Sequence, residues 1–227
     1  MHDDDDEVTG SARDFLPQRL SLPNLRSAAR GCHGCPLYRD ATQTVFGAGP
    51  SGARVMLVGE QPGNDEDIAG EPFVGPAGRV LDEALEQAGI ARDDAYVTNV
   101  VKHFKWERRG SRRLHKKPGA REVKACLPWL EQEIELIRPE VLVCLGATAA
   151  QALLGRAFRV TTMRGRLLAD ERVPQVLATV HPSSILRQPT ADDRRAEMAR
   201  FVADLAVVAE SLQARRGSGR RSSAARG

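Results

Sequence analysis

Residues 54–63 read RVMLVGEQPG, an apolar run that ends at Gly59 and is followed at once by polar residues. A short continuous apolar run bounded by glycine is typical of a strand that is buried on both faces of a parallel sheet. Further runs of this kind predict strands at 95–101, 140–145 and 175–180. Since polar residues follow several of these runs, we expect a functional crevice at the carboxyl ends of the strands.

The segments between the predicted strands have the three- and four-residue spacing of amphipathic helices. These segments are 78–88, 120–137, 147–154 and 191–212. Pro128 lies inside the second of them, which leaves open a kink or a later start, and Pro139 is expected to end it. Strands that alternate with helices favour right-handed crossovers and parallel pairing. The predicted fold is a three-layer α/β/α sandwich around a central four-stranded parallel sheet.

The length of 227 residues suits one sizeable α/β domain, which we place at 14–213. Residues 1–13 are acidic and polar and residues 214–227 are rich in Arg, Ser and Gly, so both ends are expected to be disordered. No apolar stretch is long enough to span a bilayer, and the start of the chain lacks the features of a signal peptide. The sequence therefore predicts a cytoplasmic, monomeric protein with no membrane partner.

Positive charge is concentrated in residues 102–117, which read KHFKWERRGSRRLHKK. This run contains eight Lys or Arg residues and one acid, Glu107, whereas the whole chain has a net charge of only +3. A local concentration of this kind indicates contact with a polyanion such as DNA. The alternative is a solvated charged loop with no binding role.

The spacing of two cysteines suggests a metal centre, and disulfides are not expected in a cytoplasmic protein. Cys32 and Cys35 have the spacing of half a metal or cluster site, and Cys126 lies on the predicted helix that follows the basic run. Cys144 is expected to be a buried structural thiol, because it sits inside an apolar strand. A fourth ligand would then be His103 or, as second choice, His33. Spacing alone does not separate zinc from an iron–sulfur cluster.

Four motifs occur in order along the chain, mostly at the ends of predicted strands. They are GEQPG (59–63), EPFVGPAGR (71–79), YVTNVVK (96–102) and HPSS (181–184). Together they resemble the uracil-DNA glycosylase superfamily over about residues 25–210. The resemblance implies a glycosylase-like domain that cleaves the N-glycosidic bond of deoxyuridine in DNA.

The CHGC pair at 32–35 is similar to the iron–sulfur branch of that superfamily, family 4 and its relatives. Family 4 usually has a Cys where this chain has His103, and a short loop where this chain has the basic run. Both departures, together with Gln61, resemble the UdgX group, whose members excise uracil and then become covalently joined to the abasic sugar through a His. The RRLH at 112–115 looks like the Arg-Arg-Ile-His loop of that group, which makes His115 the linking residue. The implied cofactor is a 4Fe-4S cluster held by Cys32, Cys35, His103 and Cys126.

The resemblance also assigns roles around the flipped base, and the chemistry of each side chain suits its role. Phe73 would stack on uracil, and the Asn99 amide offers one donor and one acceptor to the O4 and N3–H edge. His181 would donate to the charge that develops on O2, while the Glu60 carboxylate would stabilise the positive sugar at C1′. Gln61 and Asp67 are expected to help position the sugar and the reacting groups, and Gln61 also to contact uracil.

The predicted DNA contacts are Arg112, Arg113, Lys116, Lys117, Ser183 and Ser184. The four cations should also disfavour a further positive charge and so keep His115 neutral, as a nucleophile must be. We therefore predict a single-turnover uracil-DNA glycosylase that prefers single-stranded DNA and is trapped as an adduct between His115 and C1′. One alternative is a conventional family 4-like enzyme that turns over and releases uracil and abasic DNA. Another is a non-catalytic DNA-binding iron–sulfur protein.

Overall fold

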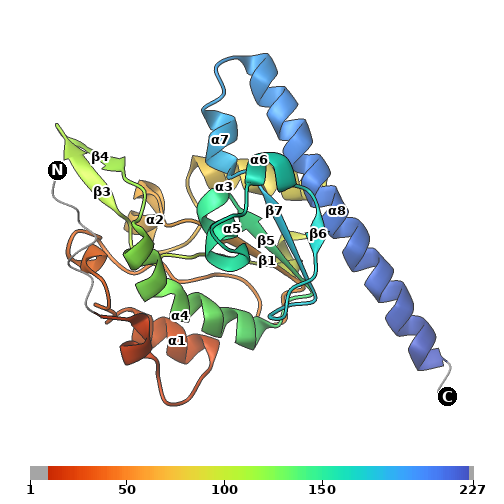
Figure 1. The fold of residues 1–227 in the computed structure, drawn as a ribbon, viewed down its shortest axis with the longest axis horizontal. Coiled ribbons are helices and arrows are strands. Elements are labelled where there is room, and N and C mark those ends of the chain that lie inside the picture. Colours follow the sequence, from red (N-terminus) through yellow and green to blue (C-terminus); the bar gives the residue numbers. More distant parts are fainter. Residues whose placement is uncertain (1–9, 225–227) are drawn as a thin grey trace.

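The computed structural model describes residues 10–224, with side chains described as far as residue 215. Its centre is a five-stranded sheet with the order β2-β1-β5-β7-β6 (Figure 1). The strands are β1 (Val55–Gly59), β2 (Ala95–Asn99), β5 (Val141–Leu145), β6 (Leu167–Leu168) and β7 (Gln175–Thr179). The four longer strands are parallel, as predicted, and β6 pairs antiparallel with β7 at one edge. The predicted count of four was one short, since a two-residue strand leaves no alternation to read.

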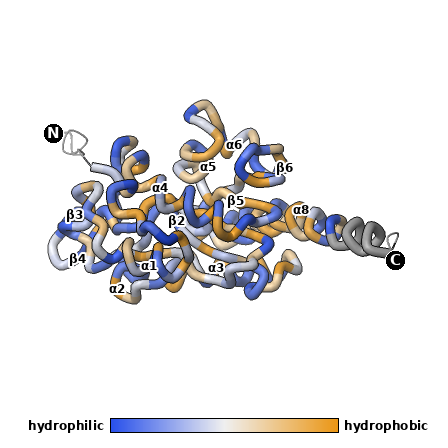
Figure 2. The backbone as a smooth tube through the Cα atoms, turned by 90° about the horizontal axis from the view of Figure 1, so that it is seen from below, coloured by the Kyte–Doolittle hydropathy of each residue, from blue (hydrophilic) through white to orange (hydrophobic). Residues whose placement is uncertain are grey.

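Helices cover both faces of the sheet, so the predicted three-layer architecture is confirmed (Figure 1). One face carries α1 (Leu22–Ala29), α4 (Ala120–Ile137) and α5 (Ala147–Leu154), and the other carries α3 (Pro76–Gln87) and α8 (Ala191–Ala224). Alternate residues of β1 serve the two cores: Met56 and Val58 belong to the first cluster, and Val55 and Leu57 to the second. Figure 2 shows hydrophobic residues running through the strands between these layers.

Helix α4 has the bounds that its periodicity predicted, and it continues through Pro128. Proline within a helix removes one backbone hydrogen bond. The neighbouring Trp129 and Leu130 are both fully buried, and we attribute the continuity of α4 to packing of this kind. The helix ends at Arg138, whose backbone is left-handed with φ of 50°, immediately before Pro139.

The basic run forms an antiparallel hairpin of β3 (Trp106–Arg109) and β4 (Arg112–His115), which the sequence did not predict. Gly110 makes the turn with φ of 61°, a backbone conformation that glycine adopts without strain. The hairpin projects beyond the sheet, and its strands are partly or fully exposed (Figure 1). Because charged residues occupy most positions of both strands, the period of two that marks a strand is hidden.

The remaining helices are short: η2 (Ala12–Phe15), η3 (Pro36–Arg39), α2 (Asn64–Ala69), η4 (Arg92–Asp94), α6 (Val160–Met163) and α7 (Pro182–Leu186). Helix α8 continues beyond its predicted end at 212 as far as Ala224, and so enters the Arg-rich segment expected to be disordered. Residues 1–9 and 225–227 lie outside the described residues, and the predicted domain boundaries stay predictions. None of the helices within 10–224 combines the length and apolar content needed to cross a bilayer.

Candidate active site

A cavity of about 740 Å³ opens at the carboxyl ends of the parallel strands, where the sequence placed the crevice. It is lined by Glu60 after β1, Asn99 at the end of β2, and His181 after β7. Of the other predicted site residues, Gln61, Phe73, His115, Lys117, Ser183 and Ser184 also line it. Parallel strands end at the same edge, so motifs far apart in sequence share one cavity.

Asn99 and Phe73 stand side by side over Gly59. A Cβ at Gly59 would collide with the Asn99 carbonyl oxygen Oδ1 and would approach the Phe73 ring to 2.8 Å, so glycine leaves the space that both need. Phe73 has φ of 58°, a left-handed conformation that costs a non-glycine residue about 1–3 kcal/mol and is found mostly at functional sites. Among the described residues, the hydrogen bond to Lys102 uses the Asn99 backbone carbonyl, and the side-chain amide lines the cavity, where its donors and its acceptor are open to a ligand.

Local hydrogen bonds set the protonation of His181. The backbone N–H of Ser183 donates to His181 Nδ1 at 3.2 Å, and the Ser183 hydroxyl lies 2.8 Å from the same nitrogen. Because a backbone N–H only donates, Nδ1 must accept, and the neutral ring carries its proton on Nε2. Burial, then the charges of Arg187 and His115, lower the pKa of His181 to about 4. His181 is thus a neutral Nε2–H donor at the cavity, stacked against Phe73 with ring centroids 6.0 Å apart.

His115 lies at the end of the hairpin and reaches the cavity beside Glu60 and Gln61, which follow β1. Its Nε2 lies 2.9 Å from Gln61 Nε2 and 3.5 Å from Glu60 Oε1. The other carboxylate oxygen of Glu60 accepts a short hydrogen bond from the Thr148 hydroxyl. The RRLH motif predicted that His115 faces the crevice. The grouping puts a carboxylate and an imidazole on one wall of the cavity.

The Gln61 amide is oriented by backbone groups of the basic run. Its Oε1 accepts from the Lys105 N–H at 3.0 Å, and its Nε2 donates to the carbonyls of Lys105 and Lys116, both at 3.1 Å. The amide nitrogen that faces His115 is a donor with two hydrogens for three acceptors, so it shares a hydrogen with His115 Nε2, whose lone pair points at Gln61. Gln61 thus contacts His115 and the loop backbone, and its roles toward the sugar and uracil stay predictions.

The pKa of His115 is lowered, as predicted, but for a different reason. Burial is the main cause, the Glu60 carboxylate opposes it, and the cation that adds to it is Arg187 of the segment after α7. The hairpin and loop cations chosen from the sequence do not carry the effect. The His115 side chain is still 49% exposed, so burial is incomplete. DNA that covered this side chain would strengthen the desolvation but also bring phosphate charges that favour the protonated ring.

Asp67 is not among the residues that line the cavity, and its predicted positioning role stays a prediction. Its carboxylate is fully buried and accepts from the backbone N–H of Thr42 at 2.9 Å. It also pairs with Arg113, whose NH1 lies 2.6 Å from Oδ2. Arg113 lies over the rings of Phe104 and Trp106 as well, with centroid distances of 5.5 and 5.4 Å. The Asp67–Arg113 pair thus braces the hairpin against α2, and the DNA contact of Arg113 stays a prediction.

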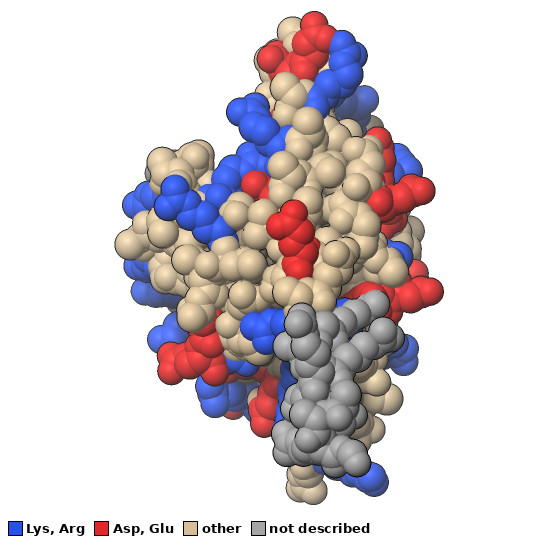
Figure 3. Space-filling model, turned by 90° about the vertical axis from the view of Figure 1, so that its right-hand side faces the viewer, with Lys and Arg blue, Asp and Glu red and all other residues tan. Residues whose placement is uncertain are grey.

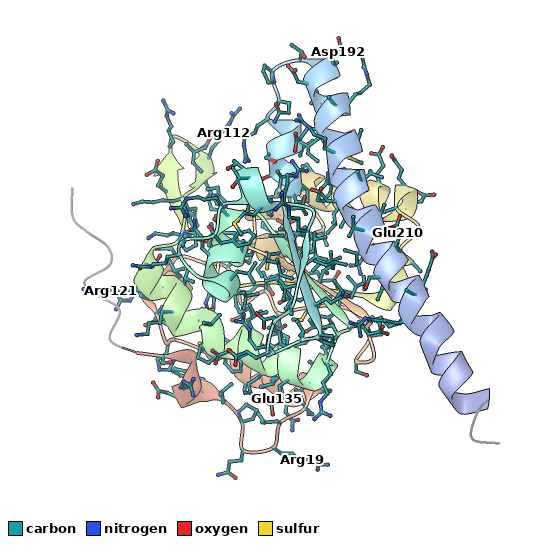
Figure 4. The ribbon with its side chains drawn as sticks, turned by 45° about the vertical axis from the view of Figure 1, so that its right-hand side comes forward. Arg19, Arg112, Arg121, Glu135, Asp192 and Glu210 are labelled. Atoms are coloured by element: carbon teal, nitrogen blue, oxygen red, sulfur yellow. The ribbon has the colours of Figure 1, made fainter. Side chains whose placement is uncertain are left out.

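Three other predicted DNA-contact residues lie on the surface. Arg112, Lys116 and Lys117 are exposed, and Figure 4 shows Arg112 on the hairpin side of the molecule with Arg121. Arg187 was missed, although it lines the cavity and donates to Ser183 Oγ at 2.9 Å. Its position six residues after His181 was the available signal, because α7 is only one turn long. By contrast, acidic and basic side chains are interspersed on the face shown in Figure 3.

Three of the predicted cluster ligands gather beside α4. Cys32, Cys35 and Cys126 are all buried, and each of the first two raises the pKa of Cys126 by its charge, after burial itself. Burial likewise raises the pKa of Cys35 to about 11. Two donors point at these sulfurs: Trp129 Nε1–H lies 3.4 Å from Cys32 Sγ, and the Lys102 N–H lies 3.3 Å from Cys126 Sγ. Such sulfurs suit a metal group, whose positive charge would favour the thiolates that burial opposes.

His103, the predicted fourth ligand, makes a contact with a hydroxyl group. His103 Nε2 lies 2.9 Å from the hydroxyl of Thr44, and burial lowers the pKa of His103 to about 4, so its ring is neutral as a ligand requires. Within the described part of the chain, no three His, Cys, Asp or Glu side chains are close enough to hold a single metal ion. A cluster, in contrast to one zinc ion, binds each ligand at a separate iron and so needs wider spacing. Cys144 is buried within β5, as predicted.

Comparison with known proteins agrees with this geometry. A family model described as the uracil DNA glycosylase superfamily matches residues 46–206. The chain is 37% identical over 178 residues to the type-4 uracil-DNA glycosylase of Pyrobaculum aerophilum, covering 75% of this chain and 87% of that protein. It is 39% identical over 165 residues to that of Thermotoga maritima, covering 72% and 82%. The chain belongs to the uracil DNA glycosylase superfamily.

Proposed function

We propose that this chain excises uracil from DNA by cleaving the N-glycosidic bond. The observation that carries the proposal is the Asn99 amide, which faces the cavity beside Phe73 and close to His181 and Glu60. Uracil offers an acceptor at O4 and a donor at N3, and one amide meets both, whereas cytosine presents the opposite pattern, a donor at N4 and an acceptor at N3. The type-4 uracil-DNA glycosylases that resemble this chain support the same substrate.

The side chains of the cavity complement the charges that develop on the substrate during the reaction. Departure of the base leaves negative charge on uracil O2, which the Nε2–H of neutral His181 would stabilise as a fixed donor. The sugar becomes positive at C1′, and the Glu60 carboxylate, held by Thr148, would stabilise it. Phe73 replaces the stacking that the flipped base loses. Each side chain thus acts at one atom of the substrate, and none needs a new protonation state.

Two fates of the sugar remain as candidates. The relatives named type-4 uracil-DNA glycosylases support ordinary turnover, in which water attacks C1′ and abasic DNA is released. The second candidate is attack by His115, and the observation that favours it is the place of this side chain on the cavity wall, with Nε2 3.5 Å from Glu60 Oε1. In that step the base leaves with the electrons of its bond to C1′, and Nε2 then gives up its contact with Gln61 and donates its pair to C1′. The adduct is a ring with positive charge beside Glu60.

We also propose that the partner is preferentially single-stranded uracil-containing DNA, bound by a monomer. Exposed cations at the hairpin and the adjoining loop, such as Arg112, Lys116 and Lys117, would contact the phosphates. A single strand presents uracil without the cost of breaking a base pair.

The three gathered cysteines and His103 are proposed to hold a 4Fe-4S cluster with a structural role. Such a cluster would join the segment before η3 to α4 and to the start of the basic run. We expect freshly purified protein to be brown with broad visible absorption, and Cys126→Ser to lose iron and colour together. Iron and zinc analysis of the same samples provides the check, because a colourless protein that contains zinc would contradict the assignment.

The lowered pKa of His181 predicts the pH dependence of excision. If His181 had its ordinary pKa of 6.5, the rate constant of excision would fall as the pH falls through that value. Because the pKa of His181 is about 4, we expect the single-turnover rate constant to show no inflection between pH 8 and 5 from this group. Below that range, protonation of Nδ1 would set it against the N–H of Ser183 and the rate should fall. An inflection near pH 6.5 that disappears in His181→Asn would contradict the neutral donor.

The substrate is tested with matched labelled single strands that contain one uracil, one thymine or one cytosine. After incubation and hot alkali, we expect cleavage at the uracil position alone, since alkali breaks DNA at abasic sites. The protein sample without alkali treatment is run on a denaturing gel to separate turnover from an adduct. Intact uracil strand in every lane would show that the proposed activity is wrong.

A further inference from the structure

A buried ion pair lies directly beneath Asn99, on the side away from the cavity. Lys102 Nζ is 2.5 Å from Glu133 Oε2, and the two side chains are 1% and 0% exposed. The same ammonium donates to the Thr98 hydroxyl at 2.6 Å and to the Asn99 carbonyl at 2.8 Å. Its three hydrogens are thereby matched with three acceptors, one of which belongs to the proposed uracil-reading residue.

Glu133 is equally well satisfied within the core. Its Oε1 accepts from the Tyr96 hydroxyl at 2.8 Å and from the backbone N–H of Gly47 at 3.1 Å, and the Thr98 hydroxyl lies 3.0 Å from both carboxylate oxygens. A Cβ at Gly47 would collide with Glu133, so the network is built into the surrounding backbone. A buried ion pair is seldom better for stability than apolar residues of the same size. Stability alone therefore gives little reason for charges at this point.

The backbone of Asn99 is held from two sides. On the β1 side, the N–H groups of Val100 and Val101 donate to the carbonyls of Gly59 and Glu60, both at 3.0 Å. On the opposite side, the Asn99 carbonyl accepts from the Lys102 ammonium. The side-chain amide opens to the cavity, so its direction depends on this peptide.

We propose that Lys102 is a positioning residue for uracil recognition: its buried ammonium, fixed by Glu133, holds the Asn99 peptide so that the amide points at the base. The inference rests on the proposed function, since it gives Asn99 the task of reading uracil. Lys102 is at the end of the YVTNVVK motif, three residues after Asn99, and the strand has already ended at that point. The turn that follows lets the side chain reach back beneath the residue that it supports.

The test compares single-turnover excision, with enzyme in excess over a uracil-containing single strand, in two neutralised pairs. Lys102→Met/Glu133→Gln removes both charges beneath Asn99 without leaving either one unpaired. Arg54→Met/Glu140→Gln does the same to a pair at the opposite ends of the strands, where Arg54 Nε lies 2.5 Å from Glu140 Oε1. Both proteins are assayed well below their melting temperatures, and each pair is also combined with Asn99→Ala.

We expect the Lys102 pair to lower the maximal rate constant about tenfold or more, which is the scale of one charged hydrogen bond. The DNA concentration for half-maximal rate should stay the same, because no phosphate contact is changed. In the Asn99→Ala background the same pair should have no further effect, since the two act through one interaction. The Arg54 pair should leave the rate constant unchanged.

An unchanged rate constant, or an equal loss with and without Asn99→Ala, would overturn the positioning role. If the double variant does not fold, Lys102→Gln/Glu133→Gln replaces it and keeps a neutral donor. Any loss of rate that this variant causes must also disappear in the Asn99→Ala background. Wild-type protein that leaves uracil in place would instead refute the proposed function, so the two failures can be told apart.

Discussion

Replacing Asn99 with aspartate is expected to lower the rate constant of uracil excision by about a hundredfold to a thousandfold. The carboxylate offers only acceptors, so uracil O4 loses its donor and meets a negative oxygen instead. Asn99 is 3% exposed, and little solvent can screen the mismatch. Phe73, His181 and Glu60 are untouched by the change, so the loss measures recognition of the base edge alone.

The measurement is the single-turnover rate constant on a single strand with one uracil. Asn24→Asp is a matched control, because it adds the same charge on α1, where the Asn24 side chain only donates to the Arg19 carbonyl. The control should excise uracil at the wild-type rate. A rate for Asn99→Asp within threefold of wild type would mean that uracil is read by a different residue.

Replacing His115 with serine is expected to abolish any covalent protein–DNA band while uracil excision continues. Serine has no imidazole nitrogen to attack C1′, and its smaller side chain leaves room for water between Glu60 and the sugar. His181, Asn99 and Phe73 keep their places, so base departure should proceed. The result should be an enzyme that turns over and leaves abasic DNA.

Both proteins are mixed with labelled uracil-containing strands, heated in denaturant and resolved on a gel. A slow band with wild type and none with His115→Ser would establish attack by His115. No slow band with either protein, together with several uracils released per wild-type molecule, would establish the turnover candidate and exclude the adduct. A band that survives in His115→Ser would place the nucleophile elsewhere.

Much of the fold followed from local patterns. The four parallel strands and α4 were predicted within two residues of their observed bounds, because buried strands are continuous apolar runs and α4 repeats at three and four residues. The hairpin was missed because its charged residues hide the alternation, and β6 because two residues carry no period. The length of α8 was underestimated because the Arg-rich segment has no apolar face to predict it.

Site residues that directly follow a strand could be predicted from the sequence. Residues whose position depends on tertiary contacts of their side chains could not. Glu60, Asn99 and His181 follow strands directly, so the parallel sheet alone brings them together. Asp67 lies in the first turn of α2 and pairs with Arg113, a contact that depends on where the hairpin packs. Thr148 and Arg187 reach the cavity from α5 and from the end of α7, and only the tertiary packing of those helices brings them there.

Excision of uracil is tested most directly by measuring the released base by mass spectrometry. A single strand with one uracil is incubated with excess wild-type protein, the mixture is denatured, and small molecules are quantified by mass spectrometry beside a thymine-containing control. We predict one free uracil base for each uracil-containing strand and no free thymine, whether the sugar ends as an abasic site or as an adduct. Uracil that stays attached to the strand, with no free base in either sample, would contradict the account.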